Sequence, residues 1–419
     1  MAILHLAWKS LSNRRITVGL TLLSIALSVC LLIGVERVRI EAKQSFANTI
    51  SGTDLIVGAR SGGVQLLLYS VFRIGDASNN ISWQSYQEIA ALPGIAWSVP
   101  VSLGDSHRGF RVMGTTDDYF THYRYARSRS LELAEGERFD DLYDVVIGAE
   151  VADRLGYRIG DAVVVAHGAN DVSFARHDDK PFRVSGILEK TGTPVDRTLH
   201  VSLQAIEAIH VDWESGAPVP GLSIDAERTR KMDLTPQTIT AAMIGLESKI
   251  ATFKVQRAIN EYRAEPLTAI LPGVALSELW NLIGIAESAL LVVSGFVVFV
   301  GLFGMLTAIL TGLNERRREM AILRSVGARP AHIFGLIMGE AAVITAAGTA
   351  SGILLLYALL SLARPFVESN YGIDIAAGAL TTTEMLLAVI VMVTGCIVAA
   401  IPAFRAYRMS LTDGLSVRI

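Results

Sequence analysis

Charged and aromatic residues are scarce in this chain of 419 residues. Only 18% of the residues are charged and 7% are aromatic, whereas 51% are hydrophobic and the mean hydropathy is +0.43. Soluble domains carry about 25% charged residues, so the deficit disfavours a wholly soluble protein. It also excludes disorder, which requires low hydrophobicity and high net charge. The net charge of −3 gives no signature of nucleic-acid binding.

Cysteines and catalytic motifs are equally sparse. The two cysteines, Cys30 and Cys396, lie inside long apolar runs, which excludes a disulfide framework in an exposed domain. The glycine-rich segment 58–63 resembles a phosphate loop, but no Lys-Ser/Thr pair follows it. HExxH, GxSxG and CxxC patterns are missing, and His177-Asp178-Asp179 favours a polar turn over a metal site. We therefore expect no catalytic, cofactor-binding or metal-ligating residues, and no enzyme.

Long uncharged runs are what the chain has in excess. A helix needs about 20 apolar residues to cross a bilayer. Four runs reach this length and predict membrane helices at about 16–35, 286–313, 335–363 and 385–404. The first run is too long for a cleaved signal peptide, and the charged residues Glu36-Arg37-Val38-Arg39 follow it, so we interpret it as an uncleaved anchor.

Basic residues set the expected orientation, because Lys and Arg accumulate in cytoplasmic loops. Five arginines lie between the second and third runs, and only Arg364 lies between the third and fourth. Lys9, Arg14 and Arg15 precede the first run, and Arg405, Arg408 and Arg418 follow the last one. We therefore expect cytoplasmic N- and C-termini and an extracytoplasmic segment of about 240 residues between the first two helices.

That extracytoplasmic segment has the pattern of an α+β domain. Short β-branched runs bounded by Gly, Asp or Pro predict strands at Asp54–Gly58, Val145–Ile147, Ala162–Ala166, Phe182–Leu188 and Leu199–Leu203. Helices are predicted at Trp83–Ala91, with Ser82 as the cap, at Ala149–Leu155, and over a long stretch from Thr235 to about Ala264. The flanking helices are expected to continue into the membrane as stalks.

The predicted fold class is a polytopic α-helical membrane protein with four transmembrane helices and a large α+β extracytoplasmic domain between helices 1 and 2. Its parts are residues 1–45 (N-terminus, helix 1 and stalk), 46–280 (extracytoplasmic domain) and 281–419 (the other three helices). Small residues let membrane helices approach closely. Those expected to do so are Gly304, Ala308, Gly312, Gly348 and Gly352. Glu340 is a candidate functional carboxylate at the membrane boundary.

The loop 314–333 between the second and third helices is the most informative segment. Met320, Leu323 and Val326 are expected to share an apolar stripe on a helix that Gly327 ends, and Pro330 is expected to open a second, short helix. An apolar stripe exposed to the cytosol predicts a docked partner. The other interpretation is a positively charged membrane anchor whose apolar side is incidental.

Several segments together resemble the permease subunit of MacB/FtsX/LolC-type ABC transporters. They are Ala7-Trp-Lys-Ser-Leu-Ser-Asn-Arg-Arg15, Val145-Val-Ile-Gly-Ala-Glu-Val-Ala-Asp-Arg-Leu-Gly156, Glu315-Arg-Arg-Arg-Glu-Met-Ala-Ile-Leu-Arg-Ser-Val-Gly-Ala328, Glu340 and Ile401-Pro-Ala-Phe-Arg-Ala-Tyr-Arg408. The resemblance implies a bacterial inner-membrane protein with a partner dimer of ABC ATPase subunits that carry the ATP and Mg. It also implies a second permease copy or paralogue, contact with membrane lipid, and a periplasmic substrate or adaptor protein.

The same resemblance implies which residues couple the chain to the ATPase. They are Met320, Leu323, Arg324, Val326, Gly327, Ala328, Pro330 and Ile333. The expected function is export or extraction of a hydrophobic or amphipathic substrate, such as a lipoprotein, lipid, peptide, haem or drug. The alternative is mechanotransmission, in which ATP-driven motion regulates an outside partner such as a cell-wall hydrolase and nothing is transported. The size of the outside segment favours transport.

Overall fold

The structure, a computed structural model, describes residues 15–126, 128–167, 177–214, 217–218, 224–315, 317–371 and 378–408. It divides into two compact units. The helical unit contains residues up to Glu41, Gly284–Phe366 and the residues from Ile375 onward, and the α/β unit contains Ala42–Ile283 and Val367–Asp374. The predicted orientation also uses basic residues that lie outside the described residues. They are those before residue 15, Arg316 and those of the tail after residue 408.

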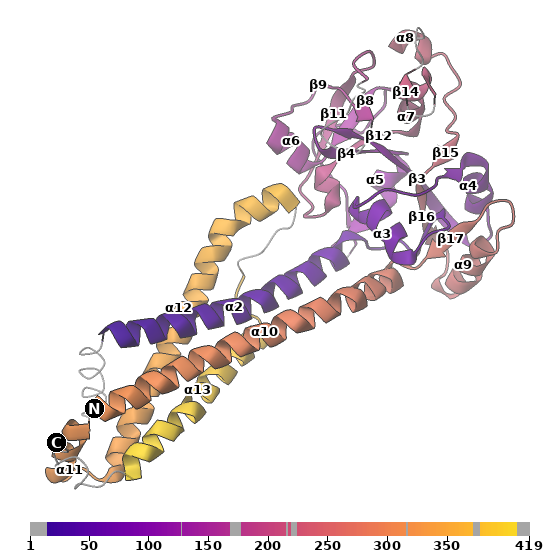
Figure 1. Cartoon of the computed structure of the whole chain (residues 1–419). Helices are drawn as coiled ribbons and strands as arrows, with labels where there is room; N and C mark the ends of the chain where they lie inside the picture. The colour runs from indigo at the N-terminus through magenta and orange to yellow at the C-terminus, as the bar shows by residue number, and fades with distance from the viewer. Residues whose placement is uncertain are drawn as a thin grey trace. The chain divides into compact units, whose positions relative to one another are not determined.

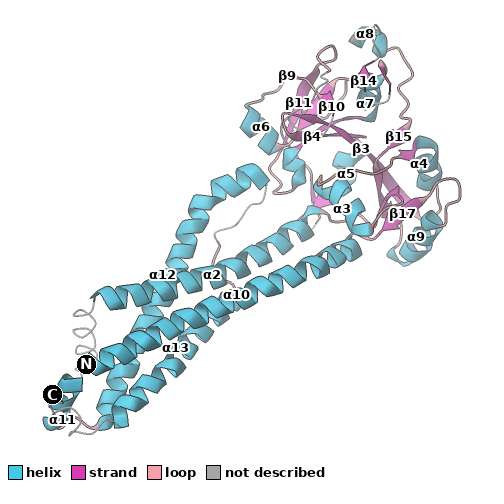
Figure 2. Cartoon of the chain, viewed as in Figure 1, coloured by secondary structure: helices cyan, strands magenta, loops and turns pink. Residues whose placement is uncertain are grey.

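Within the described residues, four helices are long and apolar enough to cross a membrane, which confirms the four predicted spans (Figures 1 and 2). They are α2 (Arg15–Thr49), α10 (Pro272–Glu315), α12 (Pro330–Tyr371) and α13 (Thr382–Arg408). The helices α2 and α10 have 35 and 44 residues. Because about 20 residues cross a bilayer, both continue well beyond it, as the predicted stalks require.

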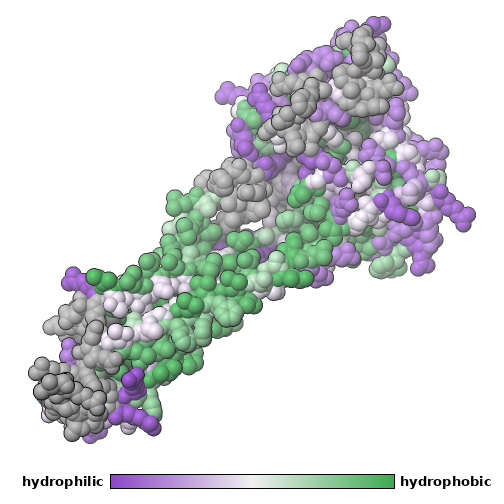
Figure 3. All heavy atoms as spheres, viewed as in Figure 1, coloured by the Kyte–Doolittle hydropathy of each residue, from purple (hydrophilic) through white to green (hydrophobic). Residues whose placement is uncertain are grey.

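The outer surface of the helical unit is apolar. Large hydrophobic side chains such as Phe296, Leu354 and Leu362 are 66–76% exposed. Figure 3 shows hydrophobic residues over the visible face of these helices and mostly hydrophilic residues over the α/β unit. Exposure of so much apolar surface to water would be costly, whereas hydrocarbon chains accommodate it. The helical unit is therefore built for a lipid environment.

Inside the helical unit, glycines bring helices into close contact with α2 and α12. A Cβ added to Gly348 would lie 2.7 Å from Ile25 Cγ2, and one added to Gly352 would lie 2.7 Å from the Ala26 carbonyl oxygen. The sequence pattern missed Gly301, which faces Ser28, and Gly395, which faces Thr345. In contrast, an added Cβ at Gly304 meets nothing within 4 Å in the described part of the chain. Ala308 and Gly312 line an internal cavity together with residues of α2 and α12.

A buried ion pair joins the end of α2 to the start of α13. Arg37 Nε and Nη2 each donate to a different carboxylate oxygen of Glu384 at 2.7 Å, and the two side chains are 3% and 0% exposed. The guanidinium also donates to the carbonyls of Gly378 and Ala379, at 3.0 and 3.1 Å. Its face lies 5.3 Å from the ring centroid of Tyr357 on α12. The planar guanidinium thus contacts α13, the segment before α13 and α12 at once.

Glu384 has a second role at the beginning of α13. The backbone N–H of Thr381 donates to Glu384 Oε2 at 2.7 Å, and the N–H of Glu384 donates to Thr381 Oγ1 at 3.3 Å. This reciprocal arrangement is a capping box, which satisfies helix N–H groups that have no partner within the helix. The same carboxylate therefore starts one membrane helix and binds another.

The α/β unit is built on one large sheet that contains eleven described strands. In spatial order they are β17 (Leu267–Ile270), β1 (Leu55–Ala59), β16 (Ala241–Leu246), β3 (Ile95–His107), β4 (Phe110–Thr115), β12 (Thr198–Ser202), β8 (Asp144–Ile147), β11 (Phe182–Leu188) and β7 (Leu133–Gly136), with β10 (Ala166–His167) beside β3 and β9 (Ala162–Val163) beside β11. Strand β3 has 13 residues. Its first half pairs with β16 and its second half with β4 and β10, so it joins the two halves of the sheet.

Helices cover this sheet, and separate apolar clusters lie between helices and strands. The helices are α3 (Gly63–Phe72), α4 (Trp83–Ala90), α5 (Asp118–His122), α6 (Ala149–Leu155), α7 (Leu203–His210), α8 (Ala226–Thr229) and α9 (Thr252–Asn260). The predicted cap of α4 is confirmed, because Ser82 accepts from the N–H of Ser85. The predicted strand at Phe182–Leu188 and helix at Ala149–Leu155 are also confirmed. The predicted strand Ala162–Ala166 is two short strands, β9 and β10.

The long helix predicted from Thr235 to Ala264 is wrong. The segment contains β15 (Thr238–Ile239), the central strand β16, a short 3-10 turn and only then α9. A strand between β1 and β3, covered on both faces, is continuously apolar and resembles a buried helix in sequence. The strand requires glycine at position 245, because a side chain there would overlap the indole of Trp97 on β3.

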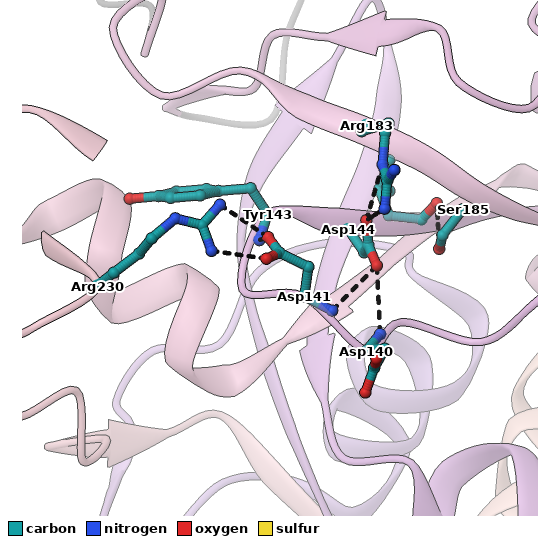
Figure 4. A network of polar contacts seen from close by, with 8 residues as sticks. Asp140, Asp141, Tyr143, Asp144, Arg183, Ser185 and Arg230 are labelled. Atoms are coloured by element: carbon teal, nitrogen blue, oxygen red, sulfur yellow. Dashed lines mark hydrogen bonds and ion pairs between the residues drawn. The ribbon is translucent and has the colours of Figure 1, made fainter. Parts of the chain in front are cut away.

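A polar network fixes the entry to β8, as Figure 4 shows. The Asp144 carboxylate accepts from the N–H of Asp141 at 3.0 Å and from Arg183 Nη2 on the neighbouring strand β11 at 2.9 Å. Asp141 in turn forms a two-pronged pair with Arg230, at 2.6 and 2.9 Å, and this bonding lowers the pKa of Asp141 below its usual range. Both carboxylates are bound to arginine and backbone N–H groups, which makes the network structural.

The ion pair gives a first prediction. Arg37→Met leaves the buried Glu384 carboxylate without its cation, and breaking a buried pair in this way costs about 3–5 kcal/mol. Replacing both partners, as Arg37→Met with Glu384→Met, removes the unpaired charge and is expected to cost less than the single change. The measurement is the thermal unfolding midpoint of the purified chain in detergent. Equal or greater loss in the double variant would contradict the role of the pair.

The glycine contacts give a second prediction. Gly352→Leu places a side chain against Ala26 and Val29 of α2, and overpacking of this kind costs about 1–3 kcal/mol. Gly295→Leu on α10 is the matched control, because an added Cβ there has no neighbour within 4 Å among the described residues. We expect a lower unfolding midpoint in detergent for Gly352→Leu alone. Equal effects of the two changes would show that α12 does not approach α2 as described.

Candidate functional site

The predicted coupling segment forms a short helix followed by a tight turn. Helix α11 spans Arg317–Ser325. Gly327 has φ +102°, its N–H donates to the Arg324 carbonyl at 3.1 Å, and the N–H of Ala328 donates to the Leu323 carbonyl at 3.0 Å. These two bonds define a Schellman motif, which ends a helix at a residue with positive φ. The prediction that Gly327 ends the helix is therefore confirmed.

Pro330 starts a helix, but not the short separate one that was predicted. It is the first residue of α12, which continues through the membrane span to Tyr371. Proline suits a first helical position because the N–H it lacks would have no helical partner there. Gly335 and Gly339, near the beginning of α12, do not break the helix, since glycine is tolerated within membrane helices. The turn at Gly327 is thus connected rigidly to a membrane helix.

The predicted apolar stripe is divided between two faces of α11. Met320 is 8% exposed and lies in a buried cluster, whereas Val326 is 84% exposed and Ile322 is 53% exposed. Leu323 is half-buried. The reason is helical geometry: at about 100° per residue, positions six apart diverge by roughly 120°, whereas positions four apart nearly coincide. Ile322 and Val326 therefore form the exposed apolar face. The sequence pattern predicted Val326 as part of the stripe but did not include Ile322.

The inward side of α11 attaches it to the helical unit. One hydrophobic cluster joins α10, α11, α12 and α13, with the buried members Leu313, Met320, Ile333, Ile337, Ala403 and Ala406. Ile333 is 2% exposed. Two predicted coupling residues, Met320 and Ile333, thus belong to the core of the helical unit, while Arg324, Ala328 and Pro330 are partly buried and Gly327 is exposed. A force on α11 therefore acts directly on three membrane helices.

Glu340 lies beside this cluster and is 8% exposed. It lines a small cavity of about 50 Å³ together with Thr17 and Thr21 of α2, Glu319 of α11 and apolar residues of α10 and α12. The predicted boundary carboxylate thus faces the interior of the helical unit rather than lipid. It lines the same cavity as Met320 and Leu323, where α11 meets the bundle.

Two family profiles match the chain. Residues 18–262 match the MacB-like periplasmic core domain, and residues 291–411 match the FtsX-like permease C-terminal domain. The first match extends over the larger part of the chain and includes the whole large sheet except β17. The second includes α11, α12 and α13.

Known proteins match over most of the chain. A macrolide export ATP-binding/permease protein MacB of Nitrobacter winogradskyi is 22% identical over 98% of this chain and 59% of its own length. A lipoprotein-releasing system transmembrane protein LolC of Xylella fastidiosa is 21% identical over 65% of this chain and 64% of its own length. The periplasmic region of MacB from Actinobacillus actinomycetemcomitans, a crystal structure, aligns with 56% of this chain and 95% of its own, at 11% identity and a TM-score of 0.34.

The chain spans about three fifths of the length of the curated relatives that it matches. Both family profiles agree with the structure, which has four apolar helices within the described residues and a large α/β unit between the first two of them. The chain therefore belongs to the FtsX-like permease family of MacB/LolC-type ABC transporters, as a multi-pass protein of the bacterial inner membrane.

Proposed function

We propose that this chain is the permease subunit through which a separate ATPase dimer moves a periplasmic domain, so that a hydrophobic or amphipathic molecule is exported or extracted. The observation that carries the proposal is the exposed pair Ile322 and Val326 on a helix whose other side is buried in the membrane bundle. An apolar face of this kind is favourable only when a partner covers it. The ATPase subunit is the partner that the family supplies.

The proposed orientation follows from the basic residues of the sequence. The N-terminus, α11 and the C-terminus face the cytoplasm, and the α/β unit faces the periplasm. ATP and Mg bind to the ATPase partner, and two permease copies, or this chain and a paralogue, complete the complex. Closure of the ATPases pushes α11, and the buried cluster around Met320 and Ile333 passes that push to α10, α12 and α13.

The relatives favour transport over purely mechanical regulation. Their names refer to macrolide export and to lipoprotein release, both of which handle hydrophobic or amphipathic molecules. Transport of such molecules from the outer leaflet or the periplasm needs force on an outside domain more than it needs a channel for the substrate. The long helices α2 and α10, which contribute residues to both units, are the proposed levers.

The docking face gives a third prediction. Val326→Asp, or Ile322→Asp, would place a carboxylate in an apolar interface, and a buried unpaired charge there costs several kcal/mol. We expect loss of co-purification with the ATPase subunit and loss of stimulated ATP turnover, while membrane insertion is retained. Ile250→Asp is the matched control, because Ile250 is 94% exposed but lies in the α/β unit. A complex that survives Val326→Asp and Ile322→Asp would place the contact elsewhere.

The fourth prediction concerns nucleotide. The sequence contains no GxxxxGK[ST] loop, so the purified chain alone is expected neither to bind nor to hydrolyse ATP. Turnover should depend on added ATPase subunit and should disappear when the phosphate-loop lysine of that subunit is replaced. The measurements are phosphate release and equilibrium binding of a fluorescent ATP analogue. Turnover by the chain itself, after removal of contaminating ATPases, would contradict the assignment.

A further inference from the structure

Three polar side chains from distant parts of the sequence converge in the α/β unit. Asp105 lies near the end of β3, His167 lies opposite it on β10, and His210 is the last residue of α7. His167 Nδ1 is 3.2 Å from Asp105 Oδ1, His210 Nε2 is 3.5 Å from the same oxygen, and the two ring nitrogens are 3.4 Å apart. One atom of each residue therefore occupies a corner of a nearly equilateral triangle.

The size of this triangle matches the coordination shell of zinc. Bonds of about 2.0–2.1 Å from a tetrahedral Zn²⁺ to nitrogen and oxygen put neighbouring ligand atoms roughly 3.3 Å apart. The three observed separations of 3.2, 3.4 and 3.5 Å bracket this edge length. An ion could thus contact all three atoms without a rearrangement of the strands or the helix that hold them.

The surroundings prepare two of these groups as ligands. His210 Nδ1 is 2.8 Å from the Ile206 carbonyl oxygen, so this nitrogen carries the proton in the neutral ring and the Nε2 lone pair points at the triangle. Asp105 is 2% exposed, and its Oδ1 is the carboxylate oxygen of the triangle. A carboxylate and an imidazole lone pair, both buried or half-buried, therefore face the same point.

A third histidine lies beside the triangle. His177 is 1% exposed, and neither of its ring nitrogens has a hydrogen-bond partner among the residues that the structure describes. Its ring lies edge-on to His210, with centroids 5.1 Å apart, and packs on Trp213 at 4.4 Å. The group of ligand atoms that lie within 4.8 Å of one another contains Asp105, His167 and His210, so His177 borders the site and is not part of the triangle.

His107 differs from His177 in the hydrogen bonding of its ring nitrogens. Its Nδ1 is 2.6 Å from the Val164 carbonyl oxygen and its Nε2 is 2.9 Å from the hydroxyl of Tyr157, so both nitrogens are already bound within the protein. The polar turn predicted at His177-Asp178-Asp179 is confirmed, because the N–H of Lys180 donates to the His177 carbonyl at 3.2 Å. Asp179 contacts the buried Lys180 at 3.3 Å, while His177 faces residues far away in sequence.

We propose that Asp105, His167 and His210 bind a divalent transition-metal ion of the Zn²⁺ type. Imidazole and carboxylate donors in a site of this size favour zinc over magnesium and calcium, which take six or more oxygen ligands. The metal joins β3, β10 and α7, so it ties the end of the strand that connects both halves of the sheet to a covering helix. The inference concerns the α/β unit alone and does not depend on the ATPase partner.

The test uses the full chain in detergent, purified without a polyhistidine tag and stripped of metal by a chelator. We titrate it with Zn²⁺ against a chromophoric chelator and expect one tight site per chain. Asp105→Asn and His167→Gln each remove a ligand and should weaken binding by more than the roughly 10–100-fold that loss of an outer-shell partner costs. His122→Ala is the control, because this half-buried ring stacks on Trp97, outside the cluster.

Cobalt supplies a second readout, because Co²⁺ in a tetrahedral nitrogen and oxygen site absorbs visible light intensely. We expect that absorption in the parent chain and in His122→Ala, and its loss in His167→Gln, which changes a partly exposed residue and should leave the fold intact. Absence of tight binding by the parent chain, or equal Zn²⁺ affinity in the parent, Asp105→Asn and His167→Gln, would overturn the proposal.

Discussion

The guanidinium of Arg37 determines how three membrane helices meet. It is buried within the protein, and buried hydrogen-bond donors out of contact with water need partners within the protein. The partners are the Glu384 carboxylate, two carbonyls of the segment before α13 and the aromatic face of Tyr357 on α12. Separation of α2, α12 and α13 at this point would leave a charge unpaired in a poorly solvated place, at a cost of several kcal/mol. These helices are therefore expected to move together.

Helix α12 connects this ion pair to the docking face. At its beginning, Ile333 packs against Met320 of α11, and further along, Gly348 and Gly352 contact α2 before Tyr357 meets Arg37. A displacement of α11 is thus transmitted through contacts between rigid helices rather than through a flexible loop. Such packing suits a family whose members, in our proposal, convert nucleotide-driven motion in the cytoplasm into motion of a periplasmic domain. Stiff elements with a few alternative packings are the usual means for such transmission.

The sequence predicted what depends on local composition and missed what depends on distant partners. The membrane helices and the strand Phe182–Leu188 followed from apolar runs and local pattern, and Gly327 ended α11 as expected. The helix predicted over Thr235–Ala264 was wrong because a strand buried on both faces has no alternation to reveal it. Arg37 and Glu384 are 347 positions apart, and Asp105 and His167 are 62 apart, so no local pattern could pair them. The capping-box spacing of Thr381 and Glu384 was the one local signal at the ion pair.

The most direct test of this account is a distance measurement between spin labels on α2 and α13 in the complex with the ATPase. With Cys30 and Cys396 replaced by alanine, cysteines at Leu31 and Leu386 place both labels on exposed positions of one chain. In lipid nanodiscs, pulsed electron resonance then reports the distance with and without a non-hydrolysable ATP analogue. The account predicts one narrow distance in both states, which broadens in Arg37→Met. A nucleotide-dependent change of this distance in the parent chain would contradict the claim that these helices transmit motion as one rigid body.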